Sequence, residues 1–360
     1  MTLGKKCSRC STRYCGAACQ EQHWKEGGHD KLCKPIKKAG GAEQYNANKK
    51  YAESVGAAAE ACAEDTKGQT CYICTQALHR KTKEGLVRMC ACRGTAGFAH
   101  VSCLAEQAKI LCDEAEENNL GQKAFNERWA RWYSCGLCEQ DYHGVVACAL
   151  GWACWKTYVG RPESDPVRMS AMRQVANGLA AVDHDEDALT VEEAQLSLMR
   201  RLDYSEEGLL TMQENLAVSY ARLGRVEEAL LMQRDVYSGR MKLDGEEHAR
   251  TFLAANNMAS SLMHLQRFGE VKALMRKTMP VARRALGDSR DLTLRMRKIY
   301  AEALYKDPGA TPDDLREAVT TIEDVERTAR RVLGGAHPAV LEFERSLREA
   351  REVLAARDVD

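Results

Sequence analysis

The sequence predicts two kinds of structure in one chain: small cysteine-rich α+β fingers, followed by an all-α solenoid of helical repeats. All 16 cysteines of the 360 residues lie between Cys7 and Cys154. From about Met169 onward, helix-forming residues dominate and apolar residues recur at spacings of three and four. A longer period of about 42 residues, visible in Ala217, Ala259 and Ala301, indicates stacked pairs of helices.

Composition and the first residues exclude several classes of protein. Lys plus Arg number 52 and Asp plus Glu number 52, and this balance argues against a strong nucleic-acid footprint. No run of 18 apolar residues occurs, so we expect no membrane span. No apolar leader precedes the first cysteines, so we expect an intracellular protein, cytoplasmic or nuclear, with reduced thiols.

The spacing of the cysteines indicates zinc rather than a disulfide framework. Cys-x-x-Cys turns bring two thiolates to one ion, and a second pair from a distant segment completes the tetrahedron. Such sites supply folding free energy that a small core cannot, so we expect small zinc-stabilised α+β fingers. The clearest set spans residues 71–138 and holds eight ligands, enough for two sites: Cys71, Cys74, Cys90, Cys92, His100, Cys103, Cys135 and Cys138.

This set resembles the RING-CH variant of the RING finger, and the resemblance extends to the text CACRGTAGFAHVSCL at residues 90–104. The resemblance implies crossed pairing, with Cys71, Cys74, His100 and Cys103 on one ion and Cys90, Cys92, Cys135 and Cys138 on the other. RING-CH fingers are ubiquitin ligase modules that hold a charged ubiquitin-conjugating enzyme. They do no covalent chemistry themselves, so no catalytic side chain is expected.

Three positions in this finger bear on docking of the conjugating enzyme. Ile73 occupies the place where the family has an apolar contact to that enzyme, although a role in the small core is the alternative. Gln107 stands where the family usually has a second, tryptophan contact. Glu139 follows the last ligand, where many active RING fingers carry a basic residue. The last two residues favour a finger that has lost docking.

A shorter module precedes it, with Tyr14-Cys15, Cys19-Gln20 and His23-Trp24 between its first and last ligands. It resembles the C-terminal portion of a MYND finger, a module that binds short peptides. The resemblance implies one zinc site from Cys7, Cys10, His29 and Cys33, and a second from Cys15, Cys19 and an upstream Cys-x-x-Cys pair.

That upstream pair is absent from the sequence, and three explanations stay open. The start codon is assigned too late, the finger binds a single zinc, or His23 is recruited from the same helix face as Cys19. We therefore expect three to four structural zinc ions. Trp24 is a candidate peptide-groove residue, with packing as the alternative.

The back half resembles the tetratricopeptide repeat in its kinesin-light-chain-like form, on residues 215–230 and a poorer copy at 257–274. The resemblance implies a concave surface that captures client peptides. Asn215 and Asn257 occupy positions that can bond a ligand backbone, or else they cap and cross-link helices. The predicted boundaries are 1–33 for the MYND-like finger, 34–69 for a linker, 70–143 for the RING-CH-like finger, 144–170 for a connector and 171–355 for about four repeats.

Two hypotheses of different classes follow. The first is an adaptor-type ubiquitin-protein ligase, in which the repeats and the MYND-like finger select a client and the RING-CH-like finger docks a ubiquitin-conjugating enzyme. The second is a non-catalytic interaction scaffold with the same zinc fingers and repeats. Ile73 and the complete set of eight ligands favour the ligase, whereas Gln107 and Glu139 favour the scaffold.

Overall fold

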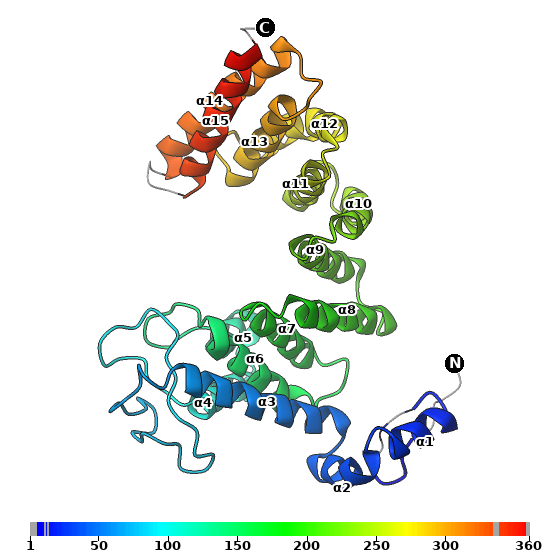
Figure 1. Cartoon of the computed structure of the whole chain (residues 1–360), viewed down its shortest axis with the longest axis vertical. Helices are drawn as coiled ribbons and strands as arrows, with labels where there is room; N and C mark the ends of the chain where they lie inside the picture. The colour runs from blue at the N-terminus through cyan, green and yellow to red at the C-terminus, as the bar shows by residue number, and fades with distance from the viewer. Residues whose placement is uncertain (1–5, 11, 13, 334–337, 358–360) are drawn as a thin grey trace. The chain divides into compact units, whose positions relative to one another are not determined.

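The computed structural model describes residues 6–10, 12, 14–333 and 338–357, and its regular secondary structure is helical (Figure 1). In chain order the elements are α1 (Ala17–Lys25), α2 (His29–Ala39), α3 (Ala42–Ala61), α4 (Val101–Glu117), α5 (Gly121–Trp129), the 3₁₀ helix η1 (Ala130–Trp132), α6 (Gly144–Tyr158), α7 (Pro166–Ala180), α8 (Asp185–Arg201), α9 (Glu206–Arg222), α10 (Val226–Leu243), α11 (Ala249–His264), α12 (Phe268–Leu286), α13 (Asp291–Tyr305), α14 (Pro312–Leu333) and α15 (Pro338–Arg357).

The α+β class expected for the fingers is not confirmed in the part of the chain that the structure describes. That part contains no strand, and isolated antiparallel bridges join Val87 to Ala99 and Ser134 to Asp141. In place of a sheet, loops and helices surround clusters of Cys and His side chains. The all-helical back half is as predicted. No described helix is both long and apolar enough to cross a bilayer.

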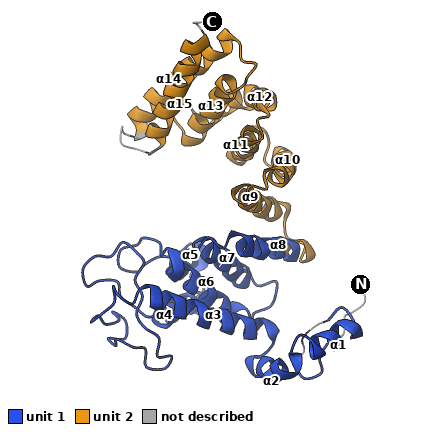
Figure 2. Cartoon of the chain, in the orientation of Figure 1, with its two compact units in different colours: residues 1–198 blue, residues 199–360 orange. Residues whose placement is uncertain are grey.

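The chain divides into two compact units, residues 1–198 and 199–360 (Figure 2). This boundary differs from the predicted start of the repeats at 171, because α7 and α8 as far as Leu198 belong to the first unit. The segment 34–69, which we expected to be a linker, is also packed against the rest of the first unit. Its helix α3 packs on α6, and Val55, Ala58 and Cys62 enter the core of the first unit. These residues lie on one helical face, but their small size conceals the face in the sequence.

The core of the first unit joins the eight-ligand finger to the surrounding helices. Leu104 and Ala108 of α4, Trp132 of η1 and Leu150 of α6 are all buried in it. Because the finger shares this core, its loops do not rely on metal alone for their position.

Polar contacts fix the same unit at two points. Ser102 donates from its main-chain N and its Oγ to the Glu84 carboxylate, both at 2.7 Å, which satisfies the first turn of α4. The buried Arg168 guanidinium donates to the main-chain oxygens of Val159 and Arg161 and to the Glu43 carboxylate. It thereby ties α3 to the turn between α6 and α7.

In the second unit, adjacent helices pack as antiparallel pairs: α9 with α10, α11 with α12, and α13 with α14, with α15 on α14. The 42-residue period has a steric origin. Ala217, Ala259 and Ala301 are all fully buried where helices approach one another. One ionic contact is also buried: Arg240 has no exposed surface and its guanidinium donates to Glu214 and Thr211. This arrangement joins α9 to α10.

We predict that Gly151→Ala lowers the free energy of unfolding of the first unit by about 2 kcal/mol. A Cβ at Gly151 would lie 2.5 Å from the main-chain oxygen of Gln174 on α7, and overpacking of this kind outweighs the gain in helix propensity. Urea unfolding followed by tryptophan fluorescence measures the change, because all five tryptophans lie in this unit.

Gly56→Ala in α3 is the matched control. A Cβ there meets no atom within 4 Å, so this substitution should stabilise the unit by about 0.5–1 kcal/mol. Equal effects of the two substitutions would contradict close packing between α6 and α7.

Candidate functional site

The described residues contain three groups of four Cys and His side chains whose ligand atoms lie within 4.8 Å of one another. The groups are Cys7, Cys10, His29 and Cys33; Cys71, Cys74, His100 and Cys103; and Cys90, Cys92, Cys135 and Cys138. In the eight-ligand finger the sequence segments alternate between the two groups. The grouping is the crossed one that the resemblance implies.

The spacing of the donor atoms fits tetrahedral zinc. A Zn–S bond of about 2.3 Å places two tetrahedral sulfurs about 3.8 Å apart. The Sγ atoms of Cys7 and Cys33 are 3.8 Å apart, and those of Cys92 and Cys135 are 3.7 Å apart. The donor set of thiolates with at most one imidazole is also the set of structural zinc sites, with no open position for a substrate.

The histidine ligands use different ring nitrogens. His100 directs Nδ1 at the sulfurs of Cys74 and Cys103, at 3.4 and 3.6 Å, while its Nε2 lies 3.4 Å from the main-chain oxygen of Ala77. That carbonyl accepts a hydrogen bond from the Nε2–H group, which leaves Nδ1 unprotonated for the metal. His29 directs Nε2 at Cys10 Sγ, at 3.4 Å, and is fully buried. The Ala77 carbonyl thus orients the His100 ring, whereas His29 Nδ1 has no hydrogen-bond partner and burial alone holds that ring.

The thiols of the third group hold their protons unequally in the absence of metal. The main-chain amide of Gln140 lowers the pKa of Cys138 to about 7, whereas burial raises the pKa of Cys90 to about 11 and that of Cys92 well above its usual range. Zinc binds thiolates, so binding displaces these protons. The affinity of the group for zinc therefore falls as the pH falls.

In the MYND-like finger, one of the two expected zinc sites has all four of its ligands. Cys15 and Cys19 are exposed and lie beside each other, but no third ligand joins them within the described residues. His23 does not belong to any of the three groups, and its Nδ1 lies 3.0 Å from the Tyr14 hydroxyl. A second zinc site at Cys15 and Cys19 therefore stays a prediction. The Trp24 ring lies 5.7 Å from the ring of the ligand His29, at a tilt of 55°, and Trp24 is 41% exposed, so a packing role and a peptide-binding role both stay open.

Two loops of the eight-ligand finger have the same geometry. In loops 71–76 and 135–140 the third residue donates its amide to the sulfur of the first, at 3.4 Å in both cases. Thr75 and Glu139 each take a left-handed backbone conformation, with φ of 60° and 58°. This turn directs the third residue outward, so Ile73 is 37% exposed and Leu137 is 52% exposed. Ile73 therefore lies at the surface of the finger rather than in its small core.

A groove of about 590 Å³ begins at Ile73 and follows α4. We call it the finger groove. It is lined by Ile73, His79, Lys81, Thr82, Ser102, Cys103, Glu106, Gln107, Ile110 and Leu111. Ile110 is 47% exposed in it and supplies an apolar surface one turn after Gln107. By contrast, Trp132 is buried in the core and Trp129 packs against it, so neither replaces the apolar contact absent at Gln107.

Sequence reasoning missed Ile110 and Leu137, although the sequence contains a signal for each. Ile110 follows Gln107 by three residues, a spacing that keeps it on the same helical face. Leu137 occupies the same position in its Cys-x-x-Cys turn that Ile73 occupies in the first. Gly136, beside Leu137, brings the second loop near the groove, because a Cβ there would lie 4.0 Å from Gln107 Oε1.

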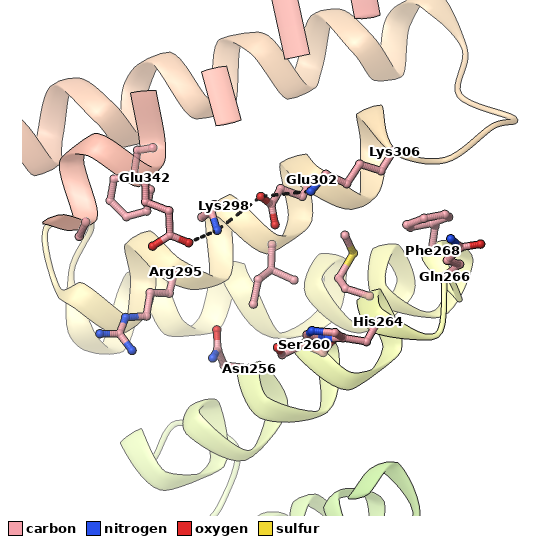
Figure 3. A pocket seen from close by; sticks show the side chains of 14 residues that line it. Asn256, Ser260, His264, Gln266, Phe268, Arg295, Lys298, Glu302, Lys306 and Glu342 are labelled. Atoms are coloured by element: carbon pink, nitrogen blue, oxygen red, sulfur yellow. Dashed lines mark hydrogen bonds and ion pairs between the residues drawn. The ribbon is translucent and has the colours of Figure 1, made fainter. Parts of the chain in front are cut away.

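The second unit contains a larger hollow, a pocket of about 900 Å³ between α11, α13 and α15 (Figure 3). We call it the repeat pocket. Asn256 lines it, and its Oδ1 has no hydrogen-bond partner although the residue is only 9% exposed. Asn215 and Asn257 do not line the pocket. The predicted role in binding a ligand backbone thus fits Asn256 better than its neighbour Asn257.

Charges on one wall of the repeat pocket neutralise one another. Lys298 Nζ lies 2.5 Å from Glu342 and 3.4 Å from Glu302, and Lys306 lies 3.6 Å from Glu302 (Figure 3). Met263, Ile299, Phe268 and Phe343 add apolar surface. The pocket therefore suits a peptide that offers main-chain donors and apolar side chains rather than a strongly charged ligand.

Comparison with known proteins identifies both fingers. Residues 2–33 match the MYND finger model, and residues 71–119 match the RING-variant domain model. The zinc-binding character predicted for the front of the chain is confirmed by these matches and by the three ligand groups.

Among solved structures, a Podosopora anserina putative kinesin light chain with nearly identical TPR-like repeats is similar at 19% identity. The match covers 65% of this chain and 98% of that one, with a TM-score of 0.44. BtubC (BKLC) from P. vanneervenii is similar at 16% identity over 66% of this chain and 92% of that one, with a TM-score of 0.49. No curated protein matches the chain.

We predict that metal analysis of the purified chain yields three zinc ions per molecule from the three described groups, and that Cys74→Ser lowers this number. Loss of one ligand should unfold the eight-ligand finger, because metal binding supplies part of its folding free energy. Far-UV circular dichroism should retain the signal of the helices in the second unit.

Cys112→Ala is the control, since Cys112 is buried in the same core but belongs to no ligand group. It should keep three ions. Fewer than two ions in the wild type, or loss of helicity across the whole chain in Cys74→Ser, would contradict the zinc assignment or the division into units.

Proposed function

We propose that this chain is an adaptor-type RING-CH ubiquitin-protein ligase that docks a charged ubiquitin-conjugating enzyme on the finger groove and selects clients through its repeats and MYND finger. The observation that carries the proposal is the group of exposed apolar side chains at and beside the groove: Ile73, Ile110 and Leu137. Exposed apolar clusters of this kind on a small, rigid module are typical of interaction sites.

The proposed activity requires binding and orientation rather than a nucleophile. The ligand groups are complete with four donors each, so they hold the finger and leave no position for a reacting group. Ile73 and Leu137 extend from loops that are fixed by their own ligand cysteines. Docking thus needs little reorganisation of the finger, which lowers the entropic cost of association.

The polar rim of the groove is suited to discrimination between conjugating enzymes. Lys81 and Glu106 provide opposite charges, while the His79 ring is held by Thr82 through a 2.8 Å hydrogen bond. Rim charges of this type select partners and set association rates more than they raise affinity. The clusters need thiolates, so we place the protein in a reducing compartment, the cytoplasm or the nucleus.

Gln107 favours the second candidate, a non-catalytic scaffold. Its amide lines the groove where an apolar contact is usual, and a partner that covers it without a hydrogen bond would lose roughly 1–3 kcal/mol. Ile110 and Leu137 compensate for this loss by adding apolar surface on either side. The balance between these residues favours the ligase.

For client selection, the proposal relies on the repeat pocket. The unpaired Oδ1 of Asn256 can accept a main-chain N–H from a peptide, and the apolar side chains Met263 and Phe343 can accept its side chains. Trp24 of the MYND finger offers a second peptide contact.

An autoubiquitination assay with a panel of conjugating enzymes tests the ligase. Wild type should form chains with at least one enzyme. Ile73→Ala and Leu137→Ala should each lower the rate about tenfold, because each removes roughly 1.5 kcal/mol of apolar burial. Leu78→Ala is the matched control: Leu78 is 60% exposed on the same finger but does not line the groove, so its rate should equal that of wild type. If wild type with normal zinc content forms no ubiquitin chains with any enzyme of the panel, that result would favour the scaffold.

The client site is tested with peptides. Peptides of twelve residues selected from a random phage library on wild type should bind Asn256→Ala about tenfold more weakly in fluorescence anisotropy, since one buried acceptor is lost. Asn257→Ala should change the dissociation constant less than about twofold. Equal losses of affinity in the two variants, or unchanged affinity in both, would exclude the repeat pocket as the client site.

A further inference from the structure

The first unit contains a second cavity, which none of the zinc ligands lines. It has a volume of about 490 Å³ and lies between α3, α6, the end of α7 and the first half of α8. All of its lining residues belong to the same compact unit. We call this cavity the α3–α8 pocket. Neither the finger groove nor the repeat pocket shares a residue with it.

The interior of the α3–α8 pocket is apolar. Its most deeply buried lining residues are Cys148 and Leu179, which are 9% and 6% exposed and share a buried cluster with Ala188 of α8. Trp152 and Val191 line it as well and pack against the same cluster. A ligand that enters therefore meets hydrocarbon and one indole ring, and burial of apolar surface would supply most of its affinity.

The pocket is preformed, because the helices that build it are packed on one another. Helix α3 packs on α6, and α6 packs on α7. The last contact is so close that a Cβ at Gly178 would lie 2.9 Å from the Cα atom of Cys148. The volume lies within the range of about 300–1,000 Å³ that is typical of pockets for single small molecules. One small molecule can thus bind without rearrangement of the helices.

The polar groups of the pocket are mainly hydrogen-bond acceptors. The hydroxyls of Ser54 and Thr190 each donate to the main-chain oxygen four residues earlier in their own helix, both at 2.9 Å, so their oxygens remain as acceptors. With histidine neutral, the charged lining groups are the Lys50 ammonium and the carboxylates of Glu53 and Asp187. The ammonium lies 3.8 Å from the first of these carboxylates. This balance disfavours an anion and favours a ligand with an N–H donor.

We propose that the α3–α8 pocket binds a small, mainly apolar amine. Its rings or chain pack against Trp152 and Val191, and its N–H group donates to Thr190 or Asp187. The inference does not depend on the proposed function, because the finger groove and the repeat pocket take no part in it. Binding is reversible and includes no covalent step.

The alternative occupant is an apolar side chain of a partner protein. Such a side chain would need no donor, and most of its affinity would come from contacts outside the pocket. A small free amine, by contrast, gains its affinity inside the pocket alone. The two occupants are therefore distinguished by a small molecule offered without any protein attached to it.

Titration of the full-length, zinc-loaded chain into N-phenyl-1-naphthylamine provides this test. The probe consists of two apolar ring systems joined by one N–H group, and its fluorescence rises when it leaves water. Wild type should give a saturable rise that fits one site. The related probe 1-anilinonaphthalene-8-sulfonate adds a sulfonate to the same skeleton. It should bind at least about tenfold more weakly, because its charge would approach the carboxylates of Glu53 and Asp187.

Substitutions on two helices locate the bound probe. Ala57 of α3 and Thr190 of α8 are exposed and line the pocket, so a phenylalanine at either position fills space at its edge without entering the core. Ala57→Phe and Thr190→Phe should each weaken binding of the amine at least about tenfold. Ala52→Phe and Ala194→Phe are the matched controls. These alanines are exposed on the same two helices but do not line the pocket, so the affinity should stay within about twofold of wild type.

Scanning calorimetry gives a second measurement. A ligand that binds only the folded state raises its melting temperature, by roughly 3–6 °C for a unit of this size at a free concentration of about ten times the dissociation constant. N-phenyl-1-naphthylamine should produce this shift in wild type and in Ala194→Phe. Thr190→Phe should show a much smaller shift at the same concentration.

Loss of affinity confined to Ala57→Phe and Thr190→Phe, with normal zinc content, supports the inference. If one of these two variants loses its zinc, the other decides. Equal affinities in all four variants overturn the inference, as does equal affinity of wild type for the two probes. Absence of saturable binding by wild type also overturns it and leaves the side chain of a partner as the occupant.

Discussion

The interaction on which the front of this protein depends is crossed coordination. Cys71 and Cys74 share a cluster with His100 and Cys103, while the segment between these pairs shares the other cluster with Cys135 and Cys138. Neither cluster can form without bringing together parts of the chain that are distant in sequence. Crossing also makes the finger one rigid body, since each site closes a loop that contains ligands of the other. The outward direction of Ile73 and Leu137 follows from the ligand loops that this constraint holds in place.

Helical packing supports the ligand clusters and determines which side chains of the finger face the groove. Glu84 binds the start of α4, and Tyr51 of α3 reaches Ser102 at the same point, with 3.0 Å between the two hydroxyl oxygens. Helix α4 is therefore held from both sides. Its apolar face enters the core through Leu104 and Ala108, which leaves Gln107 and Ile110 toward the groove. The groove thus combines one helix face with the tips of two ligand loops.

The two units divide binding between them in the proposed function. The finger groove offers a few apolar contacts with a charged rim, which suits a partner that must bind and leave in each cycle. The repeat pocket offers an unpaired acceptor at Asn256 and apolar walls, which suits an extended client segment. The proposal assigns no covalent step to this chain, only the binding that brings the conjugating enzyme and the client together.

The sequence by itself determined the zinc chemistry, the two kinds of finger and the helical back half, because ligand spacing and a 42-residue period are local patterns. Only the tertiary structure decided which residues enter the core and which line the groove and the pocket. It made 34–69 part of the finger core through small residues such as Ala58, and it gave the pocket to Asn256 rather than Asn257. It also replaced the expected sheet with ligand loops. These outcomes depend on contacts between distant segments, and spacing along the chain carries no record of such contacts.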